Sequence, residues 1–196
     1  MSRQTESFYN TFSLLYPLVD IFLKSQKNRL FKEINQLPDG NLLEIGVGNG
    51  AYFHRYKKHK IVAIDTSQTM IEIARKRNNP IVKLIQMDGK ELTFNDEQFD
   101  YVVLSHVIAV VDDPEKLFKE VQRVLKPEGK VLILNHFTPD SWLKYVDRAF
   151  AAFSKIFHFK SVFYIDEINA IKKFTLLKEV SVSSLSYFKL LIYQKK

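Results

Sequence analysis

Carboxylates and glycines gather around two apolar segments in the first third of the chain. Glu44 lies within the apolar segment 42–45, and Asp65 ends the next one, 60–65. Three glycines alternate with other residues directly after the first segment: Gly46, Gly48 and Gly50. Glycines at this spacing permit a tight turn and let the backbone come close to a bound ligand. A carboxylate after the second segment is placed to accept hydrogen bonds from ribose hydroxyls. These residues predict a nucleoside-binding unit of strand, loop, helix and strand.

The charge at the loop indicates which nucleoside is bound. The dinucleotide fingerprint G-x-G-x-x-G holds a pyrophosphate, whereas this loop reads G-x-G-x-G after Glu44. An acidic residue there repels a pyrophosphate and suits a ligand with ammonium and sulfonium groups, such as S-adenosylmethionine. Residues 63–70, running into Ala74, resemble the acidic loop and following helix of class I S-adenosylmethionine-dependent methyltransferases. A nucleotide-type fold that has lost its ligand is the alternative.

Later segments extend this resemblance over most of the chain. Residues 121–130 are similar to the methyltransferase segment usually written RVLKPGG, with Glu128 in place of the first glycine, a departure that a turn should tolerate. Residues 106–114 and 134–137 are similar to segments of the soluble bacterial phosphatidylethanolamine N-methyltransferases, and 157–163 match more loosely. The resemblance to that family implies methyl transfer to a phospholipid amine.

Alternating strand and helix patterns predict the architecture. Short apolar runs, typical of a parallel sheet covered on both faces, predict strands at 41–46, 60–65, 81–86, 99–105 and 129–135. Helices are expected at 50–57, 67–77, 113–125, 140–156 and 166–172, and two final strands near 174–183 and 186–194. The predicted fold class is therefore α/β: a doubly wound seven-stranded sheet of the class I methyltransferase type, with the last strand antiparallel and an N-terminal helical lid.

Composition limits the other classes. The 196 residues, 46% of them apolar, are enough for one domain with a full core. There is no cysteine, and the histidines fall in no metal-ligand spacing, so neither disulfides nor a metal site is expected. Segment 8–23 lacks a basic leader and contains polar residues and Pro17, which argues against a signal peptide or spanning helix and predicts a cytoplasmic protein. The net charge of +7 indicates an anionic partner or a solvated lysine-rich surface; no nucleic-acid-binding module is recognisable.

The resemblance implies a donor pocket that can be assigned by position. The alternating glycines would admit the methionine and ribose portions of the donor, Glu44 would support the loop or the ligand's amino group, and Asp65 would hold the ribose. The remaining donor-side candidates are Thr66, Met70, Met87, Asp88, Gly89, Ser105 and His106. Met70 would pack on the adenine or under its own helix. Asp88 would accept from the adenine amino group, unless it is only a helix cap, and Ser105 with His106 would border the methionine.

The acceptor side has three candidates. His106 and His136 follow the fourth and fifth predicted strands, whose ends the sheet topology brings next to the transferred methyl. Each is a candidate to accept a proton or orient an amine, or else a hydrogen-bonded structural histidine. Phe137 would face a cationic acceptor by cation–π attraction, or belongs to the ordinary core.

Residues 1–36 are expected to form a helical lid or membrane-contact segment ahead of a methyltransferase domain over 37–196. An apolar stripe recurs there at helical spacing: Phe8, Phe12, Leu15, Val19 and Phe22. Basic residues follow it: Lys24, Lys27, Arg29 and Lys32. This combination is typical of an interfacial helix on an anionic membrane, with core packing as the alternative. Related enzymes begin with two Tyr-Asp pairs. Tyr9 and Tyr16 remain here without the aspartates, which implies a tyrosine lid over the donor but no role for those carboxylates.

The expected function is transfer of methyl groups from S-adenosylmethionine to a phosphatidylethanolamine-type amine by a peripheral enzyme on the cytoplasmic membrane face. Two alternatives remain. One is a methyltransferase for a soluble small molecule, such as a quinone precursor or free amine. The other is a donor-binding accessory protein without turnover. The sequence does not predict an oligomeric state.

Overall fold

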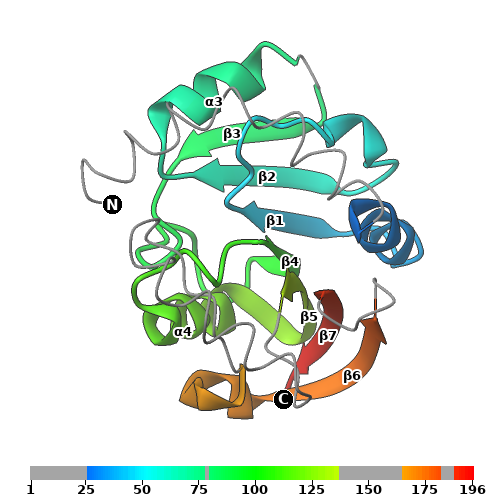
Figure 1. Ribbon diagram of the computed structural model, residues 1–196, viewed down its shortest axis with the longest axis vertical. Coiled ribbons are helices and arrows are strands. Elements are labelled where there is room, and N and C mark those ends of the chain that lie inside the picture. Colours follow the sequence, from blue (N-terminus) through cyan, green and yellow to red (C-terminus); the bar gives the residue numbers. More distant parts are fainter. Residues whose placement is uncertain (1–25, 78–79, 137–164, 182–187) are drawn as a thin grey trace, which may run out of the picture.

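Seven strands form one sheet in the computed structural model, which describes residues 26–77, 80–136, 165–181 and 188–196. The strands are β1 (Asn41–Ile45), β2 (Lys60–Asp65), β3 (Val82–Gln86), β4 (Phe99–Ser105), β5 (Leu125–His136), β6 (Phe174–Ser181) and β7 (Phe188–Lys195). Figure 1 shows them in the order β3-β2-β1-β4-β5-β7-β6. Strands β1 to β5 pair in parallel, and β7 runs antiparallel to both β5 and β6. The predicted fold class is confirmed.

The strand order reverses between β1 and β4, and this positions the site. Chain order runs outward from β1 through β2 to β3 on one side, and from β4 to β5 on the other. In open α/β sheets, ligands bind outside the carboxyl ends of the strands at such a switch point. Glu44 of β1, Asp65 at the end of β2 and Ser105 at the end of β4 all lie at or near this edge.

Helices cover both faces of the sheet. Successive residues of β1 enter different apolar clusters: Leu43 packs with α4 (Pro114–Val124), while Leu42 packs with the helix that includes residues 26–34. Ala74 of α3 (Gln68–Arg75) belongs to the second cluster. Since side chains alternate across a strand, α4 lies on one face, and α3 with the N-terminal helix on the other. Both labelled helices begin as their sequences predict, because Ser67 and Asp113 accept from backbone N–H groups three residues later.

Three local predictions were wrong. Residues 50–57 form only the 3₁₀ helix η1 (Phe53–Arg55), because Tyr56 is extended at φ −70°, ψ 127°. The expected helix at 166–172 is instead two 3₁₀ segments, η2 (Ile165–Glu167) and η3 (Asn169–Lys173), separated by the buried, extended Ile168. Strand β5 begins at residue 125 rather than 129, with an irregular register opposite 99–101. The helix expected at 140–156 lies outside the described residues.

The domain boundary near residue 36 stays a prediction, since residues 1–25 lie outside the described part of the chain. The described part of that segment already joins the core: Leu30, Phe31 and Ile34 are at most 3% exposed. Among the described residues, no helix is long and apolar enough to cross a bilayer.

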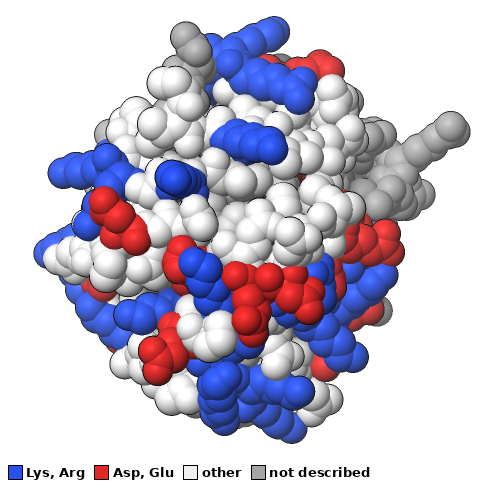
Figure 2. Space-filling model, turned by 180° about the vertical axis from the view of Figure 1, so that it is seen from behind, with Lys and Arg blue, Asp and Glu red and all other residues white. Residues whose placement is uncertain are grey.

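Charged side chains are intermixed on the face opposite that of Figure 1. Figure 2 shows lysines and arginines spread over that face, with acidic residues gathered in a band across its middle. On this face the basic excess is therefore distributed rather than collected in one stripe.

Candidate functional site

The glycine loop after β1 has a backbone that only glycine adopts readily. Gly46, Gly48 and Gly50 have φ values of +74°, +58° and +69°. The N–H groups of Gly46 and Val47 donate to the carbonyl of Ile64, at 2.8 and 3.0 Å. The loop is therefore fixed to the end of β2, at the carboxyl edge of the sheet.

Two of the three glycines are also required by packing. A Cβ on Gly46 would lie 2.4 Å from Cγ2 of Val107, and one on Gly50 would lie 2.4 Å from the ring of Phe53. Val107 belongs to the loop that follows β4, so Gly46 brings the β1 and β4 loops into contact. Gly46 and Gly50 are therefore needed for packing even without a ligand, in addition to any role in binding.

Asp65 braces the glycine loop from the neighbouring strand. Its Oδ2 accepts from the N–H of Gly48 at 2.8 Å, and its Oδ1 accepts from the N–H of Ser67 at 2.9 Å. Burial raises the pKa of the Asp65 carboxyl above its usual value, and the hydrogen bonds from Ser67, Gly48 and Thr66 oppose this. The carboxylate, the predicted ribose ligand, is held in one orientation at the end of β2, and Thr66, another donor-side candidate, follows it directly in the chain.

Glu44 is buried beneath the loop and has a tyrosine partner. Its side chain is on the same face as the N-terminal helix, and its Oε2 accepts from the hydroxyl of Tyr56 at 2.8 Å. Burial raises the pKa of Glu44, while the charge of Lys27 and the Tyr56 hydrogen bond lower it and Asp65 raises it further. The pKa of Tyr56 is raised well above its usual value, first by burial and then by Glu44.

The turn after β3 joins this site through Asp65. The N–H of Met87 donates to the Asp65 carbonyl at 3.0 Å, and Asp88 accepts from the N–H of Lys90 at 2.9 Å. Residues 88–98 form no helix, so Asp88 closes a turn rather than capping a helix. A Cβ on Gly89 would lie 2.7 Å from Ile45 and 3.0 Å from Leu117, so this glycine allows the turn to pack against β1 and α4.

Two of the acceptor-side candidates each lie beside Phe188 of β7. His106 has a left-handed backbone at φ +60°, its N–H donates to Leu134 at 2.7 Å, and its ring meets that of Phe188 at 5.8 Å. His136 is the last residue of β5 and pairs in register with Phe188. Ser105 is 6% exposed, and its hydroxyl has no hydrogen-bond partner among the described residues. A strained residue beside a buried polar group at a strand end is typical of functional sites.

One further predicted residue packs beneath its own helix, and three lie outside the described residues. Met70 is 8% exposed within α3, which matches packing under its own helix. Tyr9, Tyr16 and Phe137 lie outside the described residues.

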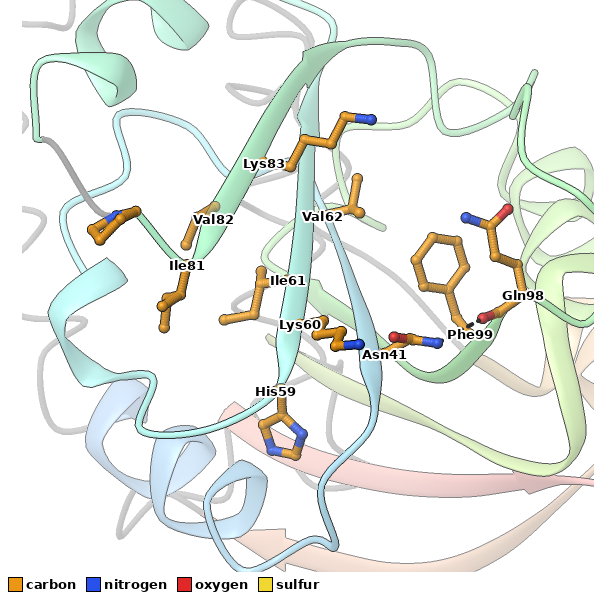
Figure 3. Close-up of a pocket in the computed structure, with 11 residues that line it drawn as sticks. Asn41, His59, Lys60, Ile61, Val62, Ile81, Val82, Lys83, Gln98 and Phe99 are labelled. Carbon is orange, nitrogen blue, oxygen red and sulfur yellow. Dashed lines mark hydrogen bonds between the residues drawn. The ribbon is translucent and has the colours of Figure 1, made fainter.

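A cavity of about 560 Å³ lies at the opposite edge of the sheet, at the amino ends of β1, β2 and β3. Figure 3 shows Val62 and Lys83 on one side of these strands and Ile61 and Val82 on the other. The hollow therefore runs across the end of the sheet and is separate from the glycine loop, Asp65 and the strand ends described above.

Comparison with known proteins identifies the family. A family model described as a methyltransferase domain matches residues 43–133. A phosphatidylethanolamine N-methyltransferase from Cereibacter sphaeroides is 34% identical over 167 residues, covering 80% of this chain and 81% of that protein. The chain belongs to the class I S-adenosylmethionine-dependent methyltransferases.

Other methyltransferases are also similar. A demethylmenaquinone methyltransferase from Staphylococcus saprophyticus is 27% identical over 123 residues, which cover 59% of this chain and 53% of that protein. An S-adenosylmethionine-dependent methyltransferase from Thermotoga maritima superposes with a TM-score of 0.74 at 24% identity, covering 97% of this chain and 99% of that one. The latter shares the fold.

The methyltransferase donor fits the residues present. The left-handed glycines leave the loop without side chains at three positions, Asp65 supplies a carboxylate next to it, and Glu44 supplies a second beneath it. The sequence analysis missed Tyr56, Val107 and Lys90, which hold these residues in place. Tyr56 was missed because it falls within the expected helix 50–57. Val107 and Lys90 were missed because their positions in the sequence do not indicate a contact with a distant loop.

Proposed function

We propose that this methyltransferase transfers methyl groups from S-adenosylmethionine to the amine of a phosphatidylethanolamine-type phospholipid at a membrane surface. The observation that carries this proposal is the 34% identity, over 80% of the chain, to the phosphatidylethanolamine N-methyltransferase of Cereibacter sphaeroides. The acceptor is then a primary amine on an anchored headgroup, and the protein meets it as a peripheral protein.

The chemistry required of the chain is modest. The donor, when bound, supplies a methyl group on an already activated sulfonium. The protein must align the acceptor amine, exclude water and take up one proton. His106 and His136 are the groups proposed to accept the proton. His106 follows β4 and His136 ends β5, and both lie near Phe188 at the carboxyl edge. A tyrosine lid of Tyr9 and Tyr16 is proposed to close over the donor, and Phe137 to attract the cationic acceptor.

The proposed membrane contact is the segment 8–32. Within its described part, Leu30 is buried, whereas Lys32 is exposed and the Arg29 side chain is 41% exposed. Lys27 instead lies over the ring of Tyr52, 5.3 Å from its centroid. We therefore assign the anionic-lipid contact to Arg29, Lys32 and the apolar stripe that begins at Phe8.

The test is methyl transfer from labelled donor to vesicles. Vesicles that contain phosphatidylethanolamine should become labelled on the headgroup amine, and matched phosphatidylcholine vesicles should not. His106→Ala and His136→Ala should be compared at saturating donor. If both variants keep the wild-type rate across about pH 6 to 9, neither histidine assists the proton transfer.

The second candidate function is methylation of a soluble small molecule, including a quinone precursor. The similarity to the Staphylococcus saprophyticus demethylmenaquinone methyltransferase favours it. Free ethanolamine and a demethylmenaquinone-type acceptor should therefore be assayed in parallel without vesicles. Turnover with either, and none with vesicles, would replace the phospholipid proposal. Donor binding without turnover on any acceptor would indicate an accessory protein.

A further inference from the structure

Tyr56 connects the N-terminal helix to the floor of the donor site. Its ring contacts Phe31 of the helix edge-on, with centroids 4.9 Å apart. Its hydroxyl donates to Oε2 of Glu44 at 2.8 Å. Both partners are buried, with Tyr56 5% exposed and Glu44 5% exposed. The contact joins residues on opposite sides of the glycine loop, since Glu44 precedes the loop and Tyr56 follows it.

The backbone at Tyr56 reflects this contact. Residues after Gly50 carry a helical pattern, yet the 3₁₀ helix η1 ends at Arg55 and Tyr56 is extended at φ −70°, ψ 127°. Continuing the helix would rotate the ring away from Phe31 and the hydroxyl away from Glu44. A buried carboxylate without a partner costs several kcal/mol, so the hydroxyl satisfies a group that would otherwise be stranded among apolar side chains.

The geometry points to Tyr56 as a positioning residue for donor binding: its hydroxyl holds the Glu44 carboxylate in the orientation that meets the ammonium group of the donor's methionine moiety. Oε2 accepts the hydrogen bond from Tyr56, and the other carboxylate oxygen is the one proposed to meet the ammonium group. The charged and titratable groups around Glu44 are Lys27 from the N-terminal helix, Tyr56 after η1 and Asp65 at the end of β2. Burial raises the pKa of Glu44, and of these groups Lys27 and Tyr56 lower it.

The test compares two ligands that differ in the amino-acid moiety. S-adenosylhomocysteine carries the ammonium group, and 5′-methylthioadenosine keeps the adenosine but lacks it. Calorimetry on Tyr56→Phe should show affinity for S-adenosylhomocysteine reduced by about fivefold or more, the scale of one hydrogen bond. Affinity for 5′-methylthioadenosine should stay unchanged, which also shows that the variant is folded. Equal losses for both ligands would mean that Tyr56 only supports the fold, and no loss for either would overturn the assignment.

Two controls sharpen the test. Tyr101→Phe removes the hydroxyl of another buried tyrosine in the same apolar cluster, 8% exposed, and should leave both affinities unchanged. In a Glu44→Gln background, Tyr56→Phe should cause no further loss, because the tyrosine acts through the carboxylate. Additive losses would contradict this.

The pH dependence supplies a third measurement. Removing the hydroxyl takes away one of the two groups that lower the Glu44 pKa, so Glu44 should take up its proton at higher pH in Tyr56→Phe. The ratio of wild-type to variant affinity for S-adenosylhomocysteine should therefore grow as pH falls toward the raised pKa of Glu44. Ionisation of the ligand itself cancels in this ratio. A ratio that stays constant down to the usual carboxyl pKa of 4.5 would show that the Tyr56 hydroxyl does not act on the Glu44 carboxylate.

Discussion

Glu44 places a carboxylate where folding alone would favour an apolar side chain. Its neighbours in the same cluster include Leu42, Tyr56 and Ala63, and its own side chain is buried. The pKa of Glu44 is raised above the usual 4.5, chiefly by burial. The stability that this proton contributes is present in full below the usual pKa and is lost as pH rises through the raised one. Above the raised pKa the ionised carboxylate therefore costs folding free energy.

The first prediction follows from this cost. Glu44→Gln keeps the shape and an oxygen for the Tyr56 hydroxyl but removes the buried charge. Without ligand, the variant should melt at a higher temperature than wild type above the raised pKa of Glu44, and the difference should shrink as pH falls through that pKa toward the usual 4.5. Its affinity for S-adenosylhomocysteine should nevertheless fall. A variant less stable than wild type above the raised pKa would mean that Glu44 contributes to folding rather than to binding.

Glu128 is strained in the irregular part of β5 between Leu125 and Lys130. The RVLKPGG pattern has glycine at this position, and Glu128 has φ +60°, a conformation that costs a residue with a side chain roughly 1 kcal/mol. The sequence expectation that the turn would tolerate the change is therefore only partly right, because the fold is kept at a cost.

The second prediction is that Glu128→Gly stabilises the protein. The free energy of unfolding in urea should rise by about 0.5–1 kcal/mol, since the side chain is exposed and its carbonyl can still accept from Gln194. Glu72→Gly, at an exposed position of α3, should instead lower it by about 1 kcal/mol. A loss of stability in Glu128→Gly would show that the Glu128 side chain has a role of its own.

At the scale of elements, Arg123 fixes the β3–β4 connection to α4. Its guanidinium donates to the carbonyls of Leu92 and Phe94, both at 2.8 Å, and to the carboxylates of Asp96 and Glu120 at 2.8 and 2.9 Å. This connection has no helix of its own, so the hydrogen bonds from Arg123, called here the fan of Arg123, hold it against α4 instead. The fan also holds the chain that follows Asp88 and Gly89, on which the predicted adenine contact depends.

The third prediction concerns this fan. Arg123→Ala should lower the free energy of unfolding by about 1–3 kcal/mol, because several partners lose a charge-assisted donor at a site that is 31% exposed. Lys119→Ala removes a cation from the same helix whose side chain is 67% exposed and whose ion pair spans 3.8 Å. It should change stability by less than about 0.5 kcal/mol. Equal effects in chemical denaturation would contradict a special role for Arg123.

The predictable elements were those with strong local signals. The strands at 41–45, 60–65 and 99–105 are mostly apolar, and Asp113 with Pro114 marks the start of α4, so local pattern and tertiary structure agree there. The helix expected at 50–57 failed because Phe53 packs on Gly50 and Tyr56 reaches Glu44, contacts that override local propensity. Ile168 likewise interrupts a helical pattern by entering the core.

Within the site, the glycine loop and its carboxylate were predictable from the sequence. Gly46, Gly48 and Asp65 form the predicted loop and brace, because alternating glycines and a strand-end carboxylate are visible in sequence. The contacts of Val107 with Gly46 and of Lys90 with Asp112 join residues far apart in the chain. Such contacts depend on the sheet order, which no local pattern encodes.

At the scale of the whole molecule, the edge that carries Asp65 and His106 must face the acceptor. If the acceptor is a phospholipid, the chain must dock on a bilayer with that edge toward the lipid. The net charge of +7 favours an anionic surface.

The fourth prediction is therefore salt-sensitive membrane binding. Co-sedimentation with vesicles should increase with anionic lipid and decrease with added salt, because surface charges are screened beyond about 10 Å at 0.1 M. Phe8→Ser with Phe12→Ser should reduce co-sedimentation and leave donor affinity largely intact. Lys60→Ala with Lys83→Ala removes two positive charges at the opposite edge of the sheet. This control variant should lose less co-sedimentation than the variant with Phe8 and Phe12 replaced. If the protein does not co-sediment with anionic vesicles at low salt, the result would support the alternative of a soluble acceptor.

The central claim is that the donor nucleoside binds against the glycine loop and Asp65, and calorimetry on Asp65→Ala tests it most directly. The ribose hydroxyls should lose at least one charge-assisted hydrogen bond, and the loop loses the brace at Gly48. Affinity should fall by about 2–4 kcal/mol, at least tenfold, for S-adenosylhomocysteine and equally for 5′-methylthioadenosine, which keeps the ribose. The far-ultraviolet circular dichroism should remain that of the wild type. An Asp65→Ala protein that binds both ligands with unchanged affinity would contradict the account.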